Sequence, residues 1–142
     1  MKISTRGRYA LRVLADMAEH NIGEYVPLKD IASRQEISLK YLEGIMILLS
    51  KSNIVAGMHG KGGGYKLKKP PEEITLGEIL RITEGSLAPV ACLDLGAEPC
   101  ERAGECKTLS VWREFYDVIN GFLDKKTLKD ITDNAGGGEY II

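Results

Sequence analysis

The stretch from Ile31 to Leu67 constrains the fold more than any other part of the chain. Its middle carries apolar residues at i, i+3, i+4 and i+7, namely Leu42, Ile45, Met46 and Leu49, which is the spacing of one buried helix face. Ser38 precedes this pattern and is a good N-cap, because its hydroxyl can accept a hydrogen bond from an amide of the first turn. We therefore predict a helix that begins after Ser38 and exposes polar side chains on its opposite face.

Two further segments flank this predicted helix. A short helix is predicted to begin after Pro27, with a turn at residues 36–37. Residues 55–67 are predicted to form two short strands around residues 60–64, of which four are glycine, the residue that lets a loop lie close to another surface. Four lysines accompany this hairpin: Lys61, Lys66, Lys68 and Lys69. This order of elements predicts a winged helix-turn-helix, with the second helix in the DNA major groove and the hairpin at the backbone or minor groove.

The distribution of charge is compatible with a nucleic-acid partner. The 142-residue chain has a formal net charge of −1. Residues 1–70 nevertheless hold 12 Lys and Arg against 6 Asp and Glu, a balance of +6, whereas residues 71–142 hold 7 against 14, a balance of −7. The basic part can face phosphate while the acidic part faces solvent or a partner.

The cellular compartment is predicted from the N-terminus and the cysteines. Residues 1–6 have neither the apolar core nor the cleavage site of a signal peptide, and no uncharged run approaches the length that crosses a bilayer. Three cysteines cannot all pair within one chain, so in a leaderless protein they indicate a reducing compartment and metal or redox chemistry. We expect a cytoplasmic protein with no membrane partner.

Some candidate DNA contacts outside the predicted recognition helix have two interpretations each. Arg6 and Arg8 lie in the first turn of a predicted N-terminal helix, where they either approach a phosphate or belong to a solvated turn. His59 lies on the hairpin, where it either reaches DNA or is simply exposed.

The chain is predicted to divide after Pro70, because the two consecutive prolines there stop regular structure. We place the DNA-binding domain at residues 1–70, a connecting helix and a cysteine-bearing sensor loop at residues 71–107, and a dimerisation helix with a C-terminal tail at residues 108–142. Thr75 and Thr127 are the predicted caps of two short helices, and the glycines at 136–138 predict a flexible tail.

A long helix with an aromatic stripe is predicted near the C-terminus. Its apolar residues recur at i, i+3, i+4, i+7, i+10 and i+11: Trp112, Phe115, Tyr116, Ile119, Phe122 and Leu123. Such a stripe packs either on its own domain or on a second copy of the chain. A small domain rarely needs so aromatic a stripe at its end, and aromatic residues dominate interface energetics, so we favour a dimer interface.

All three cysteines, Cys92, Cys100 and Cys106, lie in a predicted irregular loop over residues 86–107. Seven and five residues separate them, which is not the spacing of a zinc finger or of a redox CxxC pair. Thiolates on an irregular loop suit an iron–sulfur cluster. A solvent-exposed redox-active thiol and three unconnected cysteines are the alternatives.

Several of these segments occur together and in one order: residues 4–11, residues 37–43, the hairpin tip at 60–65, and three cysteines ahead of a Trp-bearing helix. Together they resemble the Rrf-type family of bacterial winged-helix transcription regulators, which includes IscR, NsrR and CymR. The resemblance implies a homodimeric regulator of a pseudo-palindromic operator in double-stranded DNA, and not an enzyme. It implies base contacts and minor-groove contacts from two sets of residues: Ser38, Lys40, Tyr41 and Glu43, and Gly60, Lys61 and Gly62.

The same resemblance implies a 2Fe–2S cluster on the three cysteines, with two departures from the family pattern. The first gap between cysteines is longer than the five residues usual in the IscR type. The histidine ligand of the IscR type falls at Leu109, and the acidic ligand of the nitric-oxide-sensing type falls at Arg8, which cannot ligate iron. A fourth ligand must therefore be another carboxylate, a histidine such as His20, an external thiol or water.

Other functions remain open from the sequence. Among regulators, the alternative is a clusterless repressor that responds to thiol oxidation, a small molecule or a partner protein. From another class, the chain could be an iron–sulfur redox or electron-transfer protein, although residues 60–64 lack the Lys-Ser/Thr ending of a P-loop. A protein-interaction module with the same fold would show no sequence preference among DNA fragments.

Overall fold

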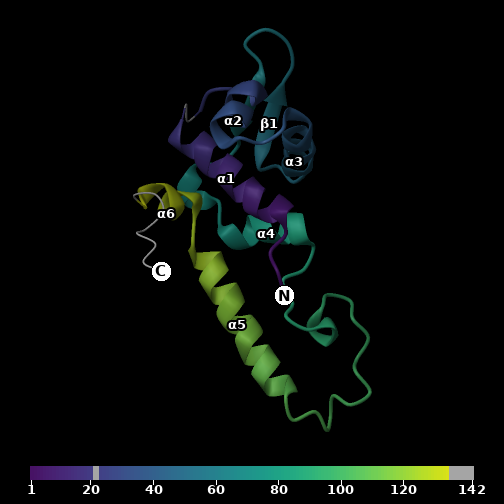
Figure 1. Cartoon of the computed structure of the whole chain (residues 1–142). Coiled ribbons are helices and arrows are strands. Elements are labelled where there is room, and N and C mark those ends of the chain that lie inside the picture. Colours follow the sequence, from purple (N-terminus) through teal and green to yellow (C-terminus); the bar gives the residue numbers. More distant parts are fainter. Residues whose placement is uncertain (21–22, 135–142) are drawn as a thin grey trace, which may run out of the picture.

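The computed structural model describes residues 1–20 and 23–134 (Figure 1). Within these ranges the elements are α1 (Thr5–Glu19), α2 (Leu28–Gln35), α3 (Leu39–Lys51), β1 (Val55–Met58), β2 (Gly64–Leu67), η1 (Pro71–Glu73), α4 (Leu76–Glu84), η2 (Ala91–Leu93), α5 (Leu109–Lys125) and α6 (Leu128–Asp133). The predicted architecture, mostly helical with a two-stranded wing and a long helix near the C-terminus, is confirmed.

The helix α1 lies at the centre of the molecule and packs against α2, α4 and α6 (Figure 1). It begins where the Ser4 hydroxyl accepts a hydrogen bond from the Gly7 amide at 2.9 Å, which satisfies one free donor of the first turn. Its apolar face joins that of α3 in one core, which includes Val13, Leu14, Met17, Leu42, Ile45, Met46 and Leu49. Burying each large aliphatic side chain stabilises the fold by about 1.5–3 kcal/mol, so this core fixes α3 relative to α1.

The helices α2 and α3 form the helix-turn-helix. Glu36 follows α2 in the left-handed conformation, with φ at 54°, and turns the chain toward α3. The Ser38 hydroxyl then accepts a hydrogen bond from the Tyr41 amide at 3.2 Å, which confirms the predicted cap. The predicted buried stripe of α3 is confirmed as well.

The strands β1 and β2 form an antiparallel hairpin that is attached to the body through Val26. The backbone of Val26 exchanges hydrogen bonds of 2.8 and 3.0 Å with Tyr65. Glycine is required at two positions here: a Cβ on Gly63 would overlap the Met58 carbonyl oxygen, and one on Gly64 would overlap that of Val26. The backbone of the wing is therefore held closely against the helix-turn-helix.

The hydrophobic core continues past Pro70. The residues Ile74, Ile79 and Leu128 belong to the same buried cluster as those of α1 and α3. Thr75 and Thr127 cap α4 and α6 as predicted. The two prolines lead into η1, and Pro71 is itself buried, so the chain changes direction there without interrupting the packing.

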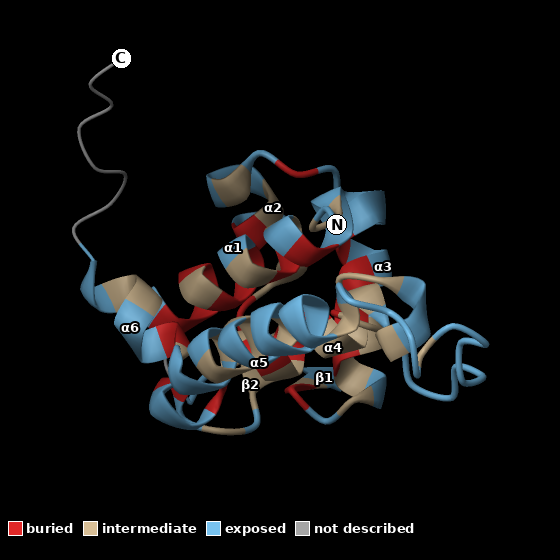
Figure 2. Ribbon diagram, turned by 90° about the horizontal axis from the view of Figure 1, so that it is seen from below, coloured by how far each residue is buried: buried red, intermediate tan, exposed pale blue. Residues whose placement is uncertain are grey.

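The helix α5 projects from this body (Figure 1). Residues 86–107, called the cysteine loop below, run from the end of α4 to the first residue of α5, which lies at the end of α5 that is distant from the body. None of the 17 residues of α5, all of which are described, is buried, and pale blue covers much of it in Figure 2. Arg81 of α4 holds the last turns of α5 by donating to Asp124 at 2.6 and 3.0 Å and to Asn120 at 2.8 Å. The tail at 136–138 lies outside the described residues.

Across the described part of the chain, each helix is too short or too polar to cross a bilayer.

Candidate nucleic-acid interface

The start of α3 presents polar side chains to solvent. Ser38, Lys40, Tyr41 and Glu43 are all exposed, on the side of the helix opposite its buried stripe. The Ser38 hydroxyl accepts from the Tyr41 amide, so its own proton remains available to a ligand. This face offers an ammonium group, two hydroxyls and a carboxylate from one and a half turns of helix.

An open cleft of about 460 Å³ joins this face to the first turn of α1. It is lined by Arg6, Ser38, Lys40, Tyr41, Gly44 and Ile45. The structure thus brings Arg6 together with three of the predicted base-contacting residues, although more than 30 residues separate them in the sequence. Two cations beside two hydroxyl groups are suited to phosphate oxygens.

The two arginines of α1 differ in how they are held. Arg6 donates from Nη2 to the Thr83 carbonyl oxygen at 2.5 Å. A guanidinium has five N–H donors, so others remain for a ligand in the cleft. Arg8 is exposed, donates to the Thr5 hydroxyl at 3.1 Å, and does not line the cleft.

A larger open groove, of about 740 Å³, lies between α3 and the wing. Glu43 of α3 lines one side, and His59 and Gly60 of the wing line the other. Lys61 and Gly62 are exposed at the tip. Gly60 and Gly62 have φ values of 92° and 80°, a region that only glycine adopts without strain.

The hairpin lysines are not equivalent. The Lys66 ammonium lies 4.8 Å from the centre of the Tyr25 ring, and Lys69 forms an ion pair with Glu78 at 2.7 Å. Lys61, by contrast, stands on the exposed tip, which makes it the strongest candidate among these lysines for a phosphate contact.

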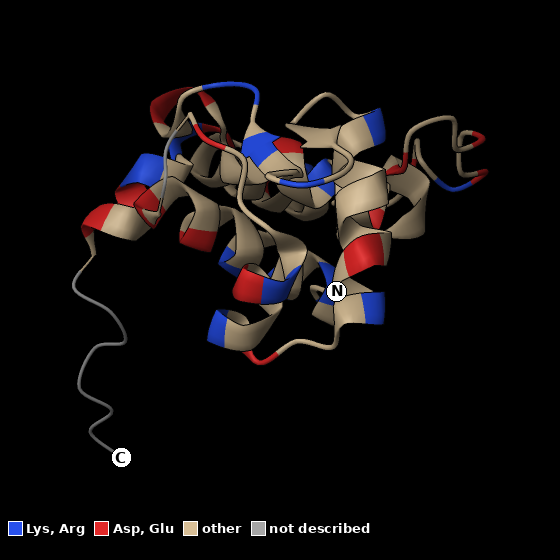
Figure 3. Ribbon diagram, turned by 90° about the horizontal axis from the view of Figure 1, so that it is seen from above, with Lys and Arg blue, Asp and Glu red and all other residues tan. Residues whose placement is uncertain are grey.

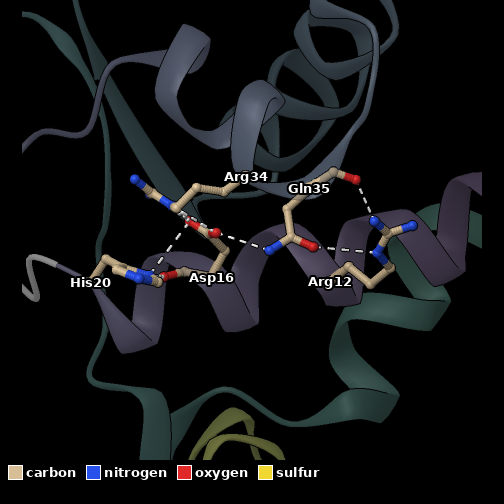
Figure 4. A network of polar contacts seen from close by, with 5 residues as sticks. All are labelled: Arg12, Asp16, His20, Arg34 and Gln35. Atoms are coloured by element: carbon tan, nitrogen blue, oxygen red, sulfur yellow. Dashed lines mark hydrogen bonds and ion pairs between the residues drawn. The ribbon is translucent and has the colours of Figure 1, made fainter. Parts of the chain in front are cut away.

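A buried carboxylate ties α1 to α2 (Figure 4). Asp16 is only 2% exposed, and it accepts hydrogen bonds from Arg34 at 2.7 and 3.0 Å and from Gln35 at 2.9 Å. Burial raises the pKa of Asp16, but the hydrogen bonds from Arg34 and Gln35 and the charges of Arg34 and His20 outweigh it, so its pKa lies below its usual value. The network fixes the helix that leads into the turn before α3.

All three thiols of the cysteine loop are free and exposed: Cys92, Cys100 and Cys106. A hydrogen bond with the Thr108 hydroxyl, at 3.4 Å, lowers the pKa of Cys106. Within residues 1–20 and 23–134, no three His, Cys, Asp or Glu side chains gather where they could hold a metal ion. The loop also carries acidic residues, and red segments mark the protruding loop in Figure 3.

The predicted aromatic stripe of α5 is an apolar face turned largely to solvent. Three of its predicted members, Trp112, Phe115 and Phe122, are exposed, and so are Val111 and Val118, which the predicted stripe did not include. Tyr116, Ile119 and Leu123 are half-buried. Trp112 and Phe115 meet edge to face, with ring centroids 6.5 Å apart. A contiguous apolar face of this kind marks an interaction site in a folded protein.

Comparison with known proteins identifies the family. The Rrf2 family model, described as an iron-dependent transcriptional regulator, matches residues 3–134. The chain is 38% identical over 134 residues to the HTH-type transcriptional regulator IscR of Serratia proteamaculans (strain 568), over 94% of this chain and 80% of that protein. This chain belongs to the Rrf2 family.

Solved structures of other regulators share the fold. CymR, the global cysteine regulator of B. subtilis, has a TM-score of 0.75 and 34% identity over 93% of this chain and 96% of its own. IscR of T. potens has a TM-score of 0.74 and 34% identity over 98% of this chain and 93% of its own. The Rrf2 chain is accordingly a DNA-binding transcription regulator and not an enzyme.

The structure places the positions that the sequence offered as a fourth ligand for the predicted cluster. Leu109 begins α5 and Arg8 is exposed on α1, and neither side chain ligates iron. His20 follows the C-terminal end of α1, where its ring lies 2.8 Å from the Asp16 carbonyl oxygen. That end of α1 points away from the cysteine loop (Figure 1), so His20 does not stand beside the thiols of the same chain.

The sequence analysis did not identify the apolar side chains that line the groove beside the wing, nor the contact that holds Arg6. Leu39 and Ile47 of α3 are 45% and 53% exposed and line the groove beside the wing, together with Met58. A signal existed, because Leu39, Glu43 and Ile47 recur every four residues and fall outside the buried stripe. The hydrogen bond from Arg6 to Thr83 had no such signal, because it joins residues 77 positions apart.

Proposed function

We propose that this Rrf2 regulator binds double-stranded DNA as a symmetric homodimer, with one α3 in the major groove of each half-site. The observation that carries the proposal is the cleft in which Arg6 joins Ser38, Lys40 and Tyr41. Lysine can donate to guanine and a glutamate such as Glu43 can accept from the cytosine amino group, so α3 has the chemistry for base contacts. Arginine and hydroxyl groups around it fix the register on the backbone.

The wing extends this contact along the duplex. Lys61 is an exposed cation at its tip, and Gly60 and Gly62 let the backbone approach closely. His59 lines the groove that separates the wing from α3. We place Lys61 and the two glycines at the minor groove or its phosphates, and Arg8 at a neighbouring phosphate.

The dimer is proposed to form through the exposed apolar face of α5. Phe122 is 57% exposed and Val118 is 64% exposed, and covering them removes apolar area from water. A two-fold axis relates two identical faces, so it also relates two copies of α3. Two such helices match half-sites about 34 Å apart, which corresponds to a pseudo-palindromic operator.

The cysteine loop is proposed to be the sensor, within the bacterial cytoplasm. Its three exposed thiols, Cys92, Cys100 and Cys106, are the soft donors that a 2Fe–2S cluster requires, and their backbone is irregular. The donor types therefore fit the cluster, with a fourth ligand from outside the three cysteines. Such a cluster would supply a redox-sensitive centre whose state biases the loop.

A second candidate mechanism dispenses with the cluster. The thiols are all exposed and no metal-binding group is assembled among the described residues. An exposed thiol can be oxidised reversibly. In that case the same loop would respond to a thiol oxidant, a small molecule or a partner protein.

Selection from a random-sequence DNA pool tests the DNA-binding part. The chain should enrich a pseudo-palindromic duplex, and anisotropy should report tight binding that weakens with salt. Lys61→Ala should weaken binding to all duplexes and reduce the salt slope by about one. Glu43→Ala should instead relax preference at one base pair, by about 1–3 kcal/mol. Equal effects of Glu43→Ala on every sequence would contradict its base-contacting role.

Anaerobic purification tests the sensor. Iron and sulfide should copurify or reconstitute, with a visible absorption spectrum that disappears when the three cysteines are replaced in turn by alanine. If neither iron nor sulfide is present after anaerobic reconstitution, the cluster hypothesis is wrong. The thiol mechanism would then remain, and it predicts an oxidant-dependent change in DNA affinity.

A further inference from the structure

The end of α4 is joined to the first turn of α1 by a small set of polar contacts. The Ser4 amide donates to Glu84 Oε1 at 2.5 Å, and the Ser4 hydroxyl donates to Glu84 Oε2 at 2.8 Å. The neighbouring Thr83 carbonyl oxygen accepts from Arg6 Nη2 at 2.5 Å. One carboxylate and one carbonyl therefore hold both the cap of α1 and the arginine that lines the DNA-binding cleft.

Gly7 shows how close this approach is. A Cβ at Gly7 would lie 2.8 Å from Glu84 Oε1 and 3.0 Å from the Thr83 hydroxyl oxygen. The residue is helical and buried, so glycine is needed here to leave room for its neighbours and not to relieve the backbone. The sequence Arg6-Gly7-Arg8 thus places a contact surface for α4 between two candidate DNA contacts.

The root of the cysteine loop adjoins the same contacts. The loop begins at Ser86, two residues after Glu84, and Leu87 is buried with 4% exposure. Residues 1–3 share a small cleft of about 190 Å³ with Glu84, Ser86 and Leu87. A displacement of the loop root therefore acts on the N-terminal segment directly.

We propose that Glu84 is a positioning residue for DNA binding, which rests on the proposed DNA-binding function. It holds the first turn of α1 so that Arg6 faces the cleft, and it passes movements of the cysteine loop to that turn. A guanidinium that is already oriented loses less freedom when it meets a phosphate than a mobile one does.

Charge and position make opposite predictions for Glu84. Removing a carboxylate near the duplex reduces repulsion from phosphate, so by charge alone its loss should tighten DNA binding. If Glu84 acts by positioning Arg6, its loss should weaken DNA binding instead. The sign of the change therefore separates the two roles.

The experiment measures anisotropy at several salt concentrations, with a duplex enriched from a random pool by the wild-type chain. Glu84→Ala should weaken binding on the order of tenfold and reduce the salt slope by about one, and Arg6→Ala should reduce the slope by the same amount. The double variant with both Arg6→Ala and Glu84→Ala should have the same DNA affinity as Arg6→Ala alone, because the two residues act through one contact. Glu84→Gln keeps an acceptor for the Ser4 amide and should bind nearly as the wild type. Glu73→Ala removes an exposed acid from η1 and is the control for charge.

The outcomes are distinct. Tighter or unchanged binding by Glu84→Ala, or losses that add in the double variant, would overturn the positioning role while leaving DNA binding intact. A wild-type chain that enriches no duplex would remove the proposed function and this inference together. If Glu84→Ala loses its helical circular dichroism, Gly7→Ala takes its place in the experiment. This variant crowds the contact between Glu84 and the first turn of α1, and it should reduce the salt slope of DNA binding in the same way.

The transmission part has its own test. Labelling the three exposed thiols with N-ethylmaleimide should change the DNA affinity of the wild-type chain and should have little effect on Glu84→Ala. Equal changes in both proteins, or none in the wild type, would contradict transmission through Glu84.

Discussion

Tyr9 of α1 and Tyr41 of α3 meet edge to face, with ring centroids 5.8 Å apart and ring planes at 84°. The Arg12 guanidinium lies 4.9 Å from the centre of the Tyr9 ring. Such aromatic pairs stabilise a fold by about 0.5–1.5 kcal/mol beyond the area they bury. Tyr41 also belongs to the exposed face of α3, so a residue of the proposed recognition helix is positioned by α1.

Replacing Tyr9 tests this relationship. Tyr9→Ala should lower the free energy of unfolding by about 2 kcal/mol, because both the aromatic pair and the packing of a half-buried ring are lost, and it should weaken DNA binding. Chemical denaturation and anisotropy measure the two effects. Tyr9→Phe keeps the ring and should behave almost as the wild type. A Phe variant as unstable as the Ala variant would show that the ring contact is not responsible.

Two helical glycines should respond in opposite ways to the same substitution. A Cβ at Gly44 of α3 meets nothing within 4 Å, whereas one at Gly77 of α4 would overlap the Asp124 carboxylate. Gly44→Ala should therefore raise the free energy of unfolding by about 1 kcal/mol through helix propensity, while Gly77→Ala should lower it. Urea denaturation measures the free energy of unfolding of the two variants. A Gly44→Ala variant less stable than the wild type would contradict the open surroundings of that position.

The stability contributed by Asp16 should depend on pH. Its folded pKa lies below the value of an unfolded aspartate, which is about 3.9. The contribution is therefore fully present above about pH 4 and is lost as the pH falls through the folded pKa. Asp16→Asn should lower the free energy of unfolding at pH 7 by about 2 kcal/mol, because hydrogen bonds to a charged group are lost. The difference in free energy of unfolding between Asp16→Asn and the wild type should be smaller at pH 3. An equal difference at both pH values would contradict this role.

A charge on the apolar face of α5 should separate the subunits. Val118→Glu and Phe122→Glu place a carboxylate where the proposed interface is dry, and burying an unpaired charge is strongly unfavourable. Both residues are exposed in the single chain, so the variants should stay folded. Sedimentation equilibrium should show monomers that bind the enriched duplex more weakly. Lys125→Glu, at the end of the same helix, is the control and should remain dimeric.

Elements with local signals were predictable from the sequence. The cap at Ser38, the buried stripe of α3 and the glycine-rich hairpin each depend on residues that lie no further apart than Val55 and Leu67, the outermost pair of the hairpin. Periodicity also predicted α5 and the apolar character of one face. These features follow from propensity and hydrophobic pattern, which the sequence displays directly.

The side-chain contacts between elements that are far apart in the sequence were not predictable in this way. The contact of Glu84 with Ser4 spans 80 positions, and that of Arg81 with Asp124 spans 43. Each depends on how two helices pack after the core has formed, and an isolated Glu or Arg on a helix carries no mark of its distant partner. The path of the cysteine loop was equally hidden, because most of it lacks regular backbone pairing.

The clamp between Arg81 and Asp124 lies near the last turn of α5, while the loop that holds the thiols is attached at the opposite end (Figure 1). A helix of 17 residues is about 25 Å long, so a tilt of about 5° at the clamp moves its far end by about 2 Å. The helix is in effect a lever arm with its pivot in the body of the subunit. Slight rearrangements at the distant end can therefore be converted into a changed separation between the two subunits of the proposed dimer.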